Sequence, residues 1–130
     1  MMIVAVGTDI VSIDRIKQSL ERHGEAFIKR IYSTGERQQA KQRNTGEARF
    51  FATRFAAKEA IWKALNRERK ENIALPDIEI LADDKGAPVV HLHKSALIAA
   101  DKKAGKTWKM DLSLSDDAGM ALAFVVFSAR

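Results

Sequence analysis

The chain has 130 residues, of which 46% are hydrophobic and 30% charged, a composition typical of one globular domain spanning residues 1–130. It has no cysteine, which excludes disulfides and thiolate metal sites, and no apolar run near the ~20 residues that span a bilayer, so we expect no membrane partner. The formal net charge of +5 favours an acidic partner: a nucleic acid, a polyphosphate cofactor or an acidic protein. The N-terminus lacks the basic segment of a signal peptide, which predicts a cytoplasmic protein.

The first third of the chain predicts a short buried strand followed by helices. Ile3–Val6 form an uninterrupted apolar run, which indicates the strand. Ser12 is suited to cap a helix that Gly24 ends, and a second short helix follows over residues 27–31. The capping-box spacing at residues 33–36 predicts a third helix, which is polar and exposed.

The rest of the chain predicts one long helix and two hairpins that flank a further helix. Hydrophobic periodicity and turn residues set the boundaries. The expected elements are a helix over 47–66, a loop over 67–75, strands at 77–81 and 89–92 joined by a turn at 83–88, a helix over 94–104 closed by Gly105, and strands at 108–114 and 120–127 joined by a turn at 116–119. This order predicts an α+β fold in which an antiparallel sheet packs against helices.

The helix over 47–66 is apolar on nearly all sides, so we expect it to be buried. A carboxylate on such a helix is costly unless it is paired or binds a cation, which makes Glu59 unusual. The residues around it on the helical surface are alanines, which leave room for a strand or a ligand. Lys63 lies one turn after Glu59, and a simple ion pair between the two is the alternative explanation.

Arg54 and Lys58 lie one turn apart on the same helix, where like charges repel. A shared anion such as a phosphate would relieve the repulsion. The alternative is that both charged ends lie in solvent while their aliphatic parts cover aromatic rings.

Asp9 follows the first apolar strand, within a run that should be mostly buried. Mg²⁺ typically binds one or two carboxylates, several waters and substrate phosphate oxygens. Asp9 at the strand end and Glu59 on the long helix would meet that need. The alternative is that Asp9 only terminates the strand.

Two segments of the chain carry a specific resemblance. They are Gly7-Thr8-Asp9-Ile10-Val11 with Arg15, and Arg54-Phe55-Ala56-Ala57-Lys58-Glu59-Ala60 with Lys63-Ala64. With weaker matches at 77–80, at Gly86 with Pro88 and at 113–115, they resemble the holo-acyl-carrier-protein synthase family. This family is the small bacterial class of 4′-phosphopantetheinyl transferases.

The resemblance implies an enzyme that moves the 4′-phosphopantetheine arm of coenzyme A (CoA) onto a serine of an apo acyl carrier protein and releases adenosine 3′,5′-bisphosphate. It implies that Asp9 and Glu59 bind Mg²⁺, and that Arg54 and Lys58 contact CoA phosphates. It places Lys63 near the transferring phosphate and the serine hydroxyl, as both a catalytic and a cofactor-binding residue. Whether Lys63, Glu59 or a metal-bound water takes the serine proton stays open.

The resemblance also implies a homotrimer with active sites at the subunit interfaces. The acidic carrier protein would dock on the first helix, where Arg15, Lys17 and Arg22 supply positive charge. The pathway that the carrier serves, in fatty-acid synthesis or elsewhere, stays open.

The chain departs from the family pattern at two places. Residues 66–71 replace a glycine-bearing loop, and Asp116 stands where many members have a histidine. How the adenylate end of CoA is held therefore stays open as well.

Two other function classes compete with the transferase. A small nucleic-acid-binding domain would explain the net charge, but the aromatic residues lie at core spacing in one helix rather than on a stacking surface, so we expect no nucleic-acid partner. A catalytically degenerate relative that serves as a binding module is favoured if the altered loop does not hold CoA. His91 and His93 share one strand face but are interpreted as surface histidines.

Overall fold

The computed structural model describes residues 1–43 and 46–130 of the chain. Its helices and strands follow one another in the order that the sequence predicts. They are β1 (Met2–Ser12), α1 (Ile13–Ile31), α2 (Thr34–Lys41), α3 (Glu47–Leu65), the 3₁₀ turn η1 (Leu75–Asp77), β2 (Ile78–Ala82), β3 (Pro88–Leu92), α4 (Lys94–Ala104), β4 (Trp108–Asp117) and β5 (Met120–Ala129).

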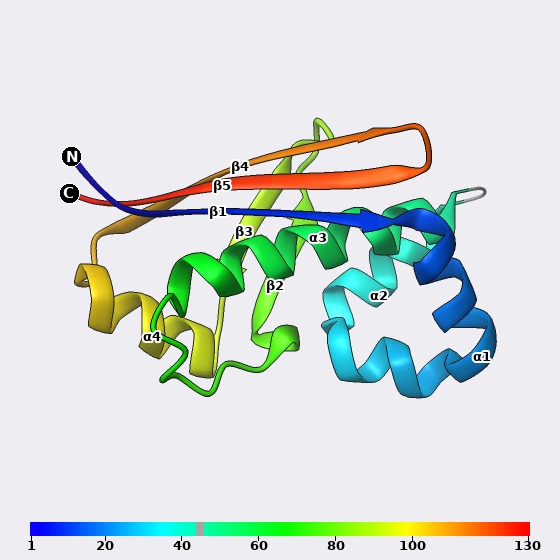
Figure 1. Cartoon of the computed structure of the whole chain (residues 1–130), viewed down its shortest axis with the longest axis horizontal. Coiled ribbons are helices and arrows are strands. Elements are labelled where there is room, and N and C mark those ends of the chain that lie inside the picture. The colour runs from blue at the N-terminus through cyan, green and yellow to red at the C-terminus, as the bar shows by residue number, and fades with distance from the viewer. Residues whose placement is uncertain (44–45) are drawn as a thin grey trace.

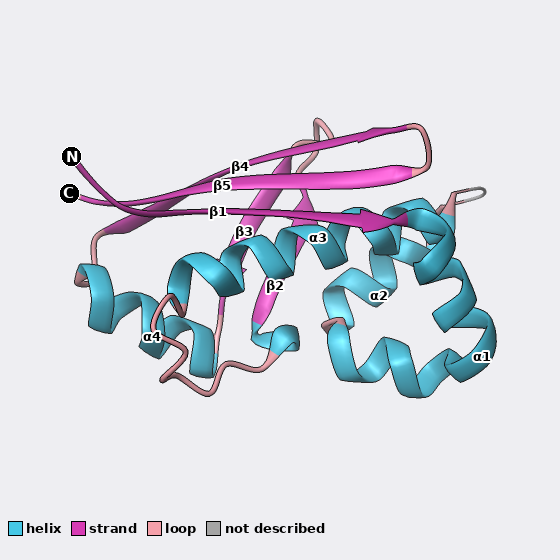
Figure 2. Cartoon of the chain, viewed as in Figure 1, coloured by secondary structure: helices cyan, strands magenta, loops and turns pink. Residues whose placement is uncertain are grey.

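The three long strands form an antiparallel sheet in the order β1–β5–β4, and β2 and β3 form a separate antiparallel hairpin. Figure 1 shows all the helices on one side of the three-stranded sheet, with α3 directly beneath it, α1 and α2 near one end and α4 near the other. Figure 2 shows the two chain ends side by side at one end of this sheet. The predicted α+β fold, with an antiparallel sheet packed against helices, is confirmed. No helix in the described ranges is long and apolar enough to cross a membrane.

Small residues let α3 lie very close to the sheet. Ala56 and Ala60 on α3, and Ala123 on β5, have no exposed surface. At Gly7 of β1 a side chain would not fit, since a Cβ atom there would lie 2.0 Å from the carbonyl oxygen of Ala60. The strand therefore lies directly on the helix backbone at this point.

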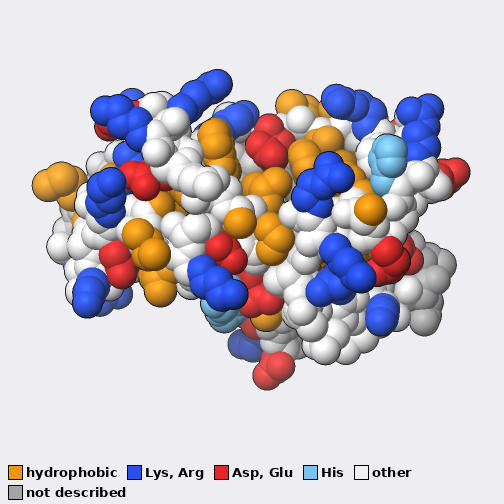
Figure 3. All heavy atoms as spheres, turned by 90° about the horizontal axis from the view of Figure 1, so that it is seen from below, with side chains coloured by type: hydrophobic (Ala, Val, Ile, Leu, Met, Phe, Trp, Pro, Cys, Tyr) orange, Lys and Arg blue, Asp and Glu red, His pale blue; other side chains and the backbone are white. Residues whose placement is uncertain are grey.

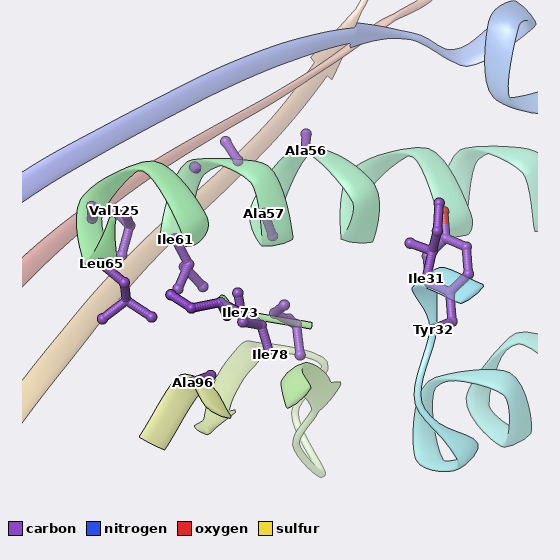
Figure 4. Packing of buried hydrophobic residues seen from close by; sticks show 14 of the residues in the cluster. Ile31, Tyr32, Ala56, Ala57, Ile61, Leu65, Ile73, Ile78, Ala96 and Val125 are labelled. Carbon is purple, nitrogen blue, oxygen red and sulfur yellow. The ribbon is translucent and has the colours of Figure 1, made fainter. Parts of the chain in front are cut away.

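Larger apolar side chains fill the other side of α3. Ile61 and Leu65 are fully buried, and Figure 4 shows them pointing toward Ile73, Ile78 and Ala96 below the helix. The long helix is thus buried between two layers, as its apolar sequence predicts.

Local sequence signals set several element boundaries as expected. The Ser12 hydroxyl accepts a hydrogen bond from Arg15 N and caps α1, and Ser33 and Glu36 form the predicted capping box of α2. Gly24 adopts φ 49° and ψ −126°, so α1 consists of two helical segments with a bend between them, as predicted. The predicted helix 94–104 is confirmed residue for residue.

Two predictions about local environment are wrong. The first strand does not end before Asp9, because β1 continues to Ser12 and Asp9 pairs with Ala123 inside the sheet. The third helix is polar but not fully exposed, because Glu36 and Ala40 are buried against the rest of the fold. Both errors have the same cause: the neighbouring strand and the buried partner come from distant parts of the chain.

Candidate active site

Asp9, Glu59 and Lys63 meet where β1 crosses α3. Lys63 Nζ lies 3.2 Å from Asp9 Oδ1 and donates to the carbonyl oxygen of Thr8 at 3.0 Å. The Asp9 side chain is 17% exposed and that of Lys63 is 52% exposed. The close approach of Gly7 to Ala60 holds Asp9 over this part of the helix.

Glu59 lies beside the Asp9 carboxylate without an ion pair of its own in the described part of the chain. The predicted alternative, a pair between Glu59 and Lys63, is not formed, because Lys63 turns to β1 instead. Burial raises the pKa of Glu59, the Asp9 charge raises it further, and Lys63 only partly offsets both. Within the described ranges, one lysine therefore only partly neutralises the two carboxylates.

A hollow of about 300 Å³ opens beside these carboxylates. It is lined by Asp9 and Glu59 together with residues of α1 and α3, among them Arg15, Ser19 and Phe55. No group of three or more histidine, cysteine, aspartate or glutamate side chains suited to a metal occurs in the described ranges. The donor set is two carboxylates, which suits a hard cation that fills its remaining positions with water and phosphate oxygens.

Lys58 does not lie in this site. Its side chain is fully buried, and its ammonium group forms an ion pair with buried Glu36 at 2.7 Å. The same nitrogen donates to the carbonyl oxygens of Leu75, at 3.0 Å, and Ile78. All three ammonium protons are used within the protein, so in this structure Lys58 joins α3 to α2 and β2 and is not free to contact a phosphate, contrary to our prediction.

Arg54 lies in a second hollow, of about 420 Å³, formed by the start of α3, the β2–β3 turn and the end of β4. Only 8% of Arg54 is exposed, and its Nε has no hydrogen-bond partner within the described ranges. The guanidinium carbons of Arg54 and Arg43 lie 4.3 and 4.9 Å from the ring centre of Phe50. Burial, followed by repulsion from Arg43, lowers the pKa of Arg54 to about 10. An anion in this hollow would supply the missing acceptor.

The two hollows lie on different sides of α3. Nine residues separate Arg54 from Lys63, which corresponds to about 13.5 Å along a helix and about 180° around it. Glu59 and Lys63 lie on the side of α3 that meets Asp9 of β1, whereas Arg54 faces the hollow bordered by the β2–β3 turn.

Residues 5–125 match the family model of the 4′-phosphopantetheinyl transferase superfamily. A holo-[acyl-carrier-protein] synthase of Zymomonas mobilis is 44% identical over 131 residues, which cover 98% of either chain. The ACPS–CoA complex of Chronobacterium ammoniagenes has a TM-score of 0.83 at 27% identity, over 97% of either chain. The holo-(acyl-carrier-protein) synthase of Bacillus anthracis, in complex with CoA (3′,5′-ADP), has a TM-score of 0.77 at 31% identity over the whole of both chains.

The chain belongs to the 4′-phosphopantetheinyl transferase superfamily. The resemblance found in its two motifs is thereby confirmed for the chain as a whole. In this superfamily member the two motifs meet in space. Residues 7–11 of the first motif lie on β1, the second motif forms the middle of α3, and β1 crosses α3 at this point.

Sequence reasoning found part of the second hollow of this superfamily member, since Arg54 and the weaker family matches at Gly86, Pro88, Leu114 and Ser115 all line it. Arg43, Arg49, Phe50 and Asp116 line it together with Arg54, although they are far apart in the sequence or carry no motif. Asp116 stood out in the sequence as a departure from the family pattern, but no sequence signal pointed to Arg43, Arg49 or Phe50 as part of a site.

The remaining predicted positions lie on α1, in the loop over residues 66–71 and at the two histidines. Arg15, Lys17 and Arg22 are exposed on α1, and Figure 3 shows basic and acidic side chains mixed over the helical side of the molecule. Residues 66–71 form a closed loop, in which Asn66 Nδ2 donates to the carbonyl oxygen of Glu71 at 2.7 Å and Asn66 Oδ1 accepts from Glu71 N at 3.0 Å. His93 lies 3.0 Å from Glu79 Oε1, and His91 is exposed.

Proposed function

We propose that this protein is a holo-acyl-carrier-protein synthase, which transfers the 4′-phosphopantetheine arm of CoA to a serine of an apo acyl carrier protein and releases adenosine 3′,5′-bisphosphate. The observation that carries the proposal is the meeting of Asp9, Glu59 and Lys63 at the crossing of β1 and α3. The full-length match to proteins named holo-[acyl-carrier-protein] synthase supports it. CoA-bound relatives of the same fold support CoA as the donor.

Asp9 and Glu59 would hold a Mg²⁺ ion. The raised pKa of Glu59 supports this, since a cation between the two carboxylates would offset both causes that raise it, burial first and repulsion from Asp9 second. When bound, the ion would neutralise charge on the diphosphate of CoA as the P–O bond breaks.

Lys63 supplies the mobile positive charge of the site. Its half-exposed ammonium group lies beside Asp9 and is able to turn toward a phosphate that enters the hollow. The serine proton would pass to a group at this hollow: Glu59 lines it, and Lys63 lies 3.2 Å from Asp9, which also lines it. Arg54 would contact a phosphate of CoA in the second hollow, a role that Lys58 does not share.

One molecule of CoA would require both hollows, which lie on different sides of α3. A second copy of the chain that presents its own Arg54 hollow to the first copy's carboxylates would solve this problem. The uncovered face of the three-stranded sheet supports such an assembly, because it exposes a row of apolar side chains: Val6, Ile10, Leu122 and Phe124, each 42–59% exposed. Apolar surface of this kind typically marks an interface. We therefore propose a homotrimer with shared active sites.

The carrier protein would dock on α1. Arg15 lines the hollow beside Asp9 and Glu59, so a partner bound there would bring its serine close to the carboxylates. Lys17 and Arg22 are exposed farther along the same helix and would attract an acidic surface.

The test incubates the protein with CoA, Mg²⁺ and apo acyl carrier protein and follows the mass of the carrier. We expect the mass to rise by one phosphopantetheine arm with wild type, and the rate to fall at least about 10²-fold with Asp9→Ala and Glu59→Ala. Asp84→Ala, which removes an exposed carboxylate in the β2–β3 turn, is the matched control and should act like wild type. Unchanged rates in the first two variants would show that the site is wrongly assigned.

A further inference from the structure

The second hollow, which holds Arg54, also contains an acidic residue. Asp116 lies at the end of β4, and its Oδ2 is 3.4 Å from Nε of Arg49, in the first turn of α3. Both side chains line the hollow, and they are partly exposed, 32% for Asp116 and 66% for Arg49. The pair therefore lies where the hollow meets solvent.

The rest of the hollow is built for an anion. Arg43 and Arg54 contact the same phenyl ring, and burial together with mutual repulsion disfavours the charged form of Arg54. The Nε of Arg54, which has no hydrogen-bond partner among the described residues, is buried there. Guanidinium groups in this arrangement bind phosphate oxygens with good geometry. If the two carboxylates on the other side of α3 engage the diphosphate of CoA, the phosphate left for this hollow is the phosphomonoester at the nucleotide end.

Asp116 acts against such a ligand. A phosphomonoester carries nearly two negative charges at neutral pH, and a carboxylate in the wall of the same hollow repels it. Asp116 also holds Arg49 in place, which favours binding, but an exposed ion pair of this length contributes little. The repulsion is the larger effect.

We propose that Asp116 is a specificity-determining residue that limits how tightly this hollow binds a phosphomonoester, and that it thereby sets the preference for CoA over dephospho-CoA. The inference rests on the proposed function, since it takes CoA as the ligand. Weaker binding of this phosphate would also speed the release of adenosine 3′,5′-bisphosphate after transfer.

Asp116→Asn removes the negative charge of this residue while keeping a side chain that reaches Arg49. Asparagine has nearly the same shape, and its amide oxygen can accept a hydrogen bond from Arg49. Asp117→Asn is the matched control, because Asp117 is an exposed neighbour on the same strand that does not line the hollow.

The first measurement compares, by calorimetry, binding of adenosine 3′,5′-bisphosphate with that of adenosine 5′-monophosphate, which keeps the 5′ phosphate but lacks the 3′ phosphate that this hollow would take. We expect Asp116→Asn to bind the bisphosphate about threefold to tenfold more tightly at low salt while binding of the monophosphate hardly changes. Asp117→Asn should match wild type with both nucleotides. An equal change with both nucleotides, or weaker binding of the bisphosphate, would overturn the proposal.

The second measurement compares kcat/KM for CoA and dephospho-CoA. We expect the ratio of the two to rise by a similar factor in Asp116→Asn, mainly through KM for CoA. If no variant transfers the arm but the nucleotide binding changes as expected, the proposed function fails and the role of Asp116 in phosphate binding stands. If transfer occurs and the ratio does not rise, the role of Asp116 fails and the proposed function stands.

Discussion

The buried ion pair between Lys58 and Glu36 allows the sharpest test of how this fold is held together. Both side chains are fully buried, and Lys58 Nζ lies 2.7 Å from Glu36 Oε1. Lys58→Met removes the ammonium group but keeps most of the side-chain volume. The Glu36 carboxylate then loses its only cationic partner in the described ranges, while its hydrogen bonds from the backbone of Ser33 and Ile80 are kept.

Removing one partner of a buried ion pair typically destabilises a protein by about 3–5 kcal/mol. Two carbonyl oxygens, of Leu75 and Ile78, lose their donor as well, so we expect the upper part of this range. Burial raises the pKa of Glu36 and lowers the pKa of Lys58, and each charge offsets this for the other. Glu36→Gln combined with Lys58→Met should therefore recover part of the lost stability, because no unpaired charge stays buried.

The assay is guanidinium unfolding without CoA, followed by KM for CoA under conditions where each variant is folded. Lys106→Met, at an exposed position, is the control and should change neither quantity. An unchanged free energy of unfolding for Lys58→Met together with a large rise in KM would refute our reasoning. That result would instead support the phosphate contact that the sequence predicted for Lys58.

Three further predictions concern the sheet and the carboxylates. Gly7→Ala should lower the free energy of unfolding by more than about 2 kcal/mol and reduce transfer about 10²-fold, because a Cβ atom 2.0 Å from the Ala60 carbonyl oxygen must push Asp9 away from α3. Ala5→Gly on the same strand is the control, since Gly86→Ala would add strain at a residue with positive φ. In metal-free buffer at neutral pH, Glu59→Gln should raise the melting temperature, because a carboxyl group whose pKa is raised in the folded protein lowers stability as pH rises through that pKa. The difference in melting temperature should vanish toward pH 4. A constant difference at all pH values would contradict an origin in the charge of Glu59. Phe124→Asp should convert the proposed trimer to a smaller species in light scattering, whereas an unchanged mass would place the interface elsewhere.

Local sequence signals were sufficient for the helices and their ends. The cap at Ser12 and the left-handed Gly105 after α4 depend on residues within a few positions of each other, so they are visible in the sequence. The apolar surface of residues 47–65 likewise predicted a buried helix, because burial of such a surface is required wherever the helix lies.

Long-range contacts produced the errors. Arg54 and Lys58 differ by four positions and lie about 40° apart on the helix, so their sequence context is nearly the same. One borders a hollow and the other lies against Glu36 of α2. Nothing near Lys58 in the sequence indicates the carboxylate that neutralises it.

The sequence by itself determined the family and the order of the elements, and it pointed to Asp9 and Glu59 as candidate ligands, because these follow from local residue patterns. Only the tertiary structure decided which charged residues face a hollow and which stabilise the core. It also showed that Lys63 pairs with Asp9 of β1 while Arg54 lies in a separate hollow. The physical reason is that the environment of a charged side chain is set by whatever packs opposite it, and here those partners are far away in the chain, 54 positions for Lys63 and Asp9.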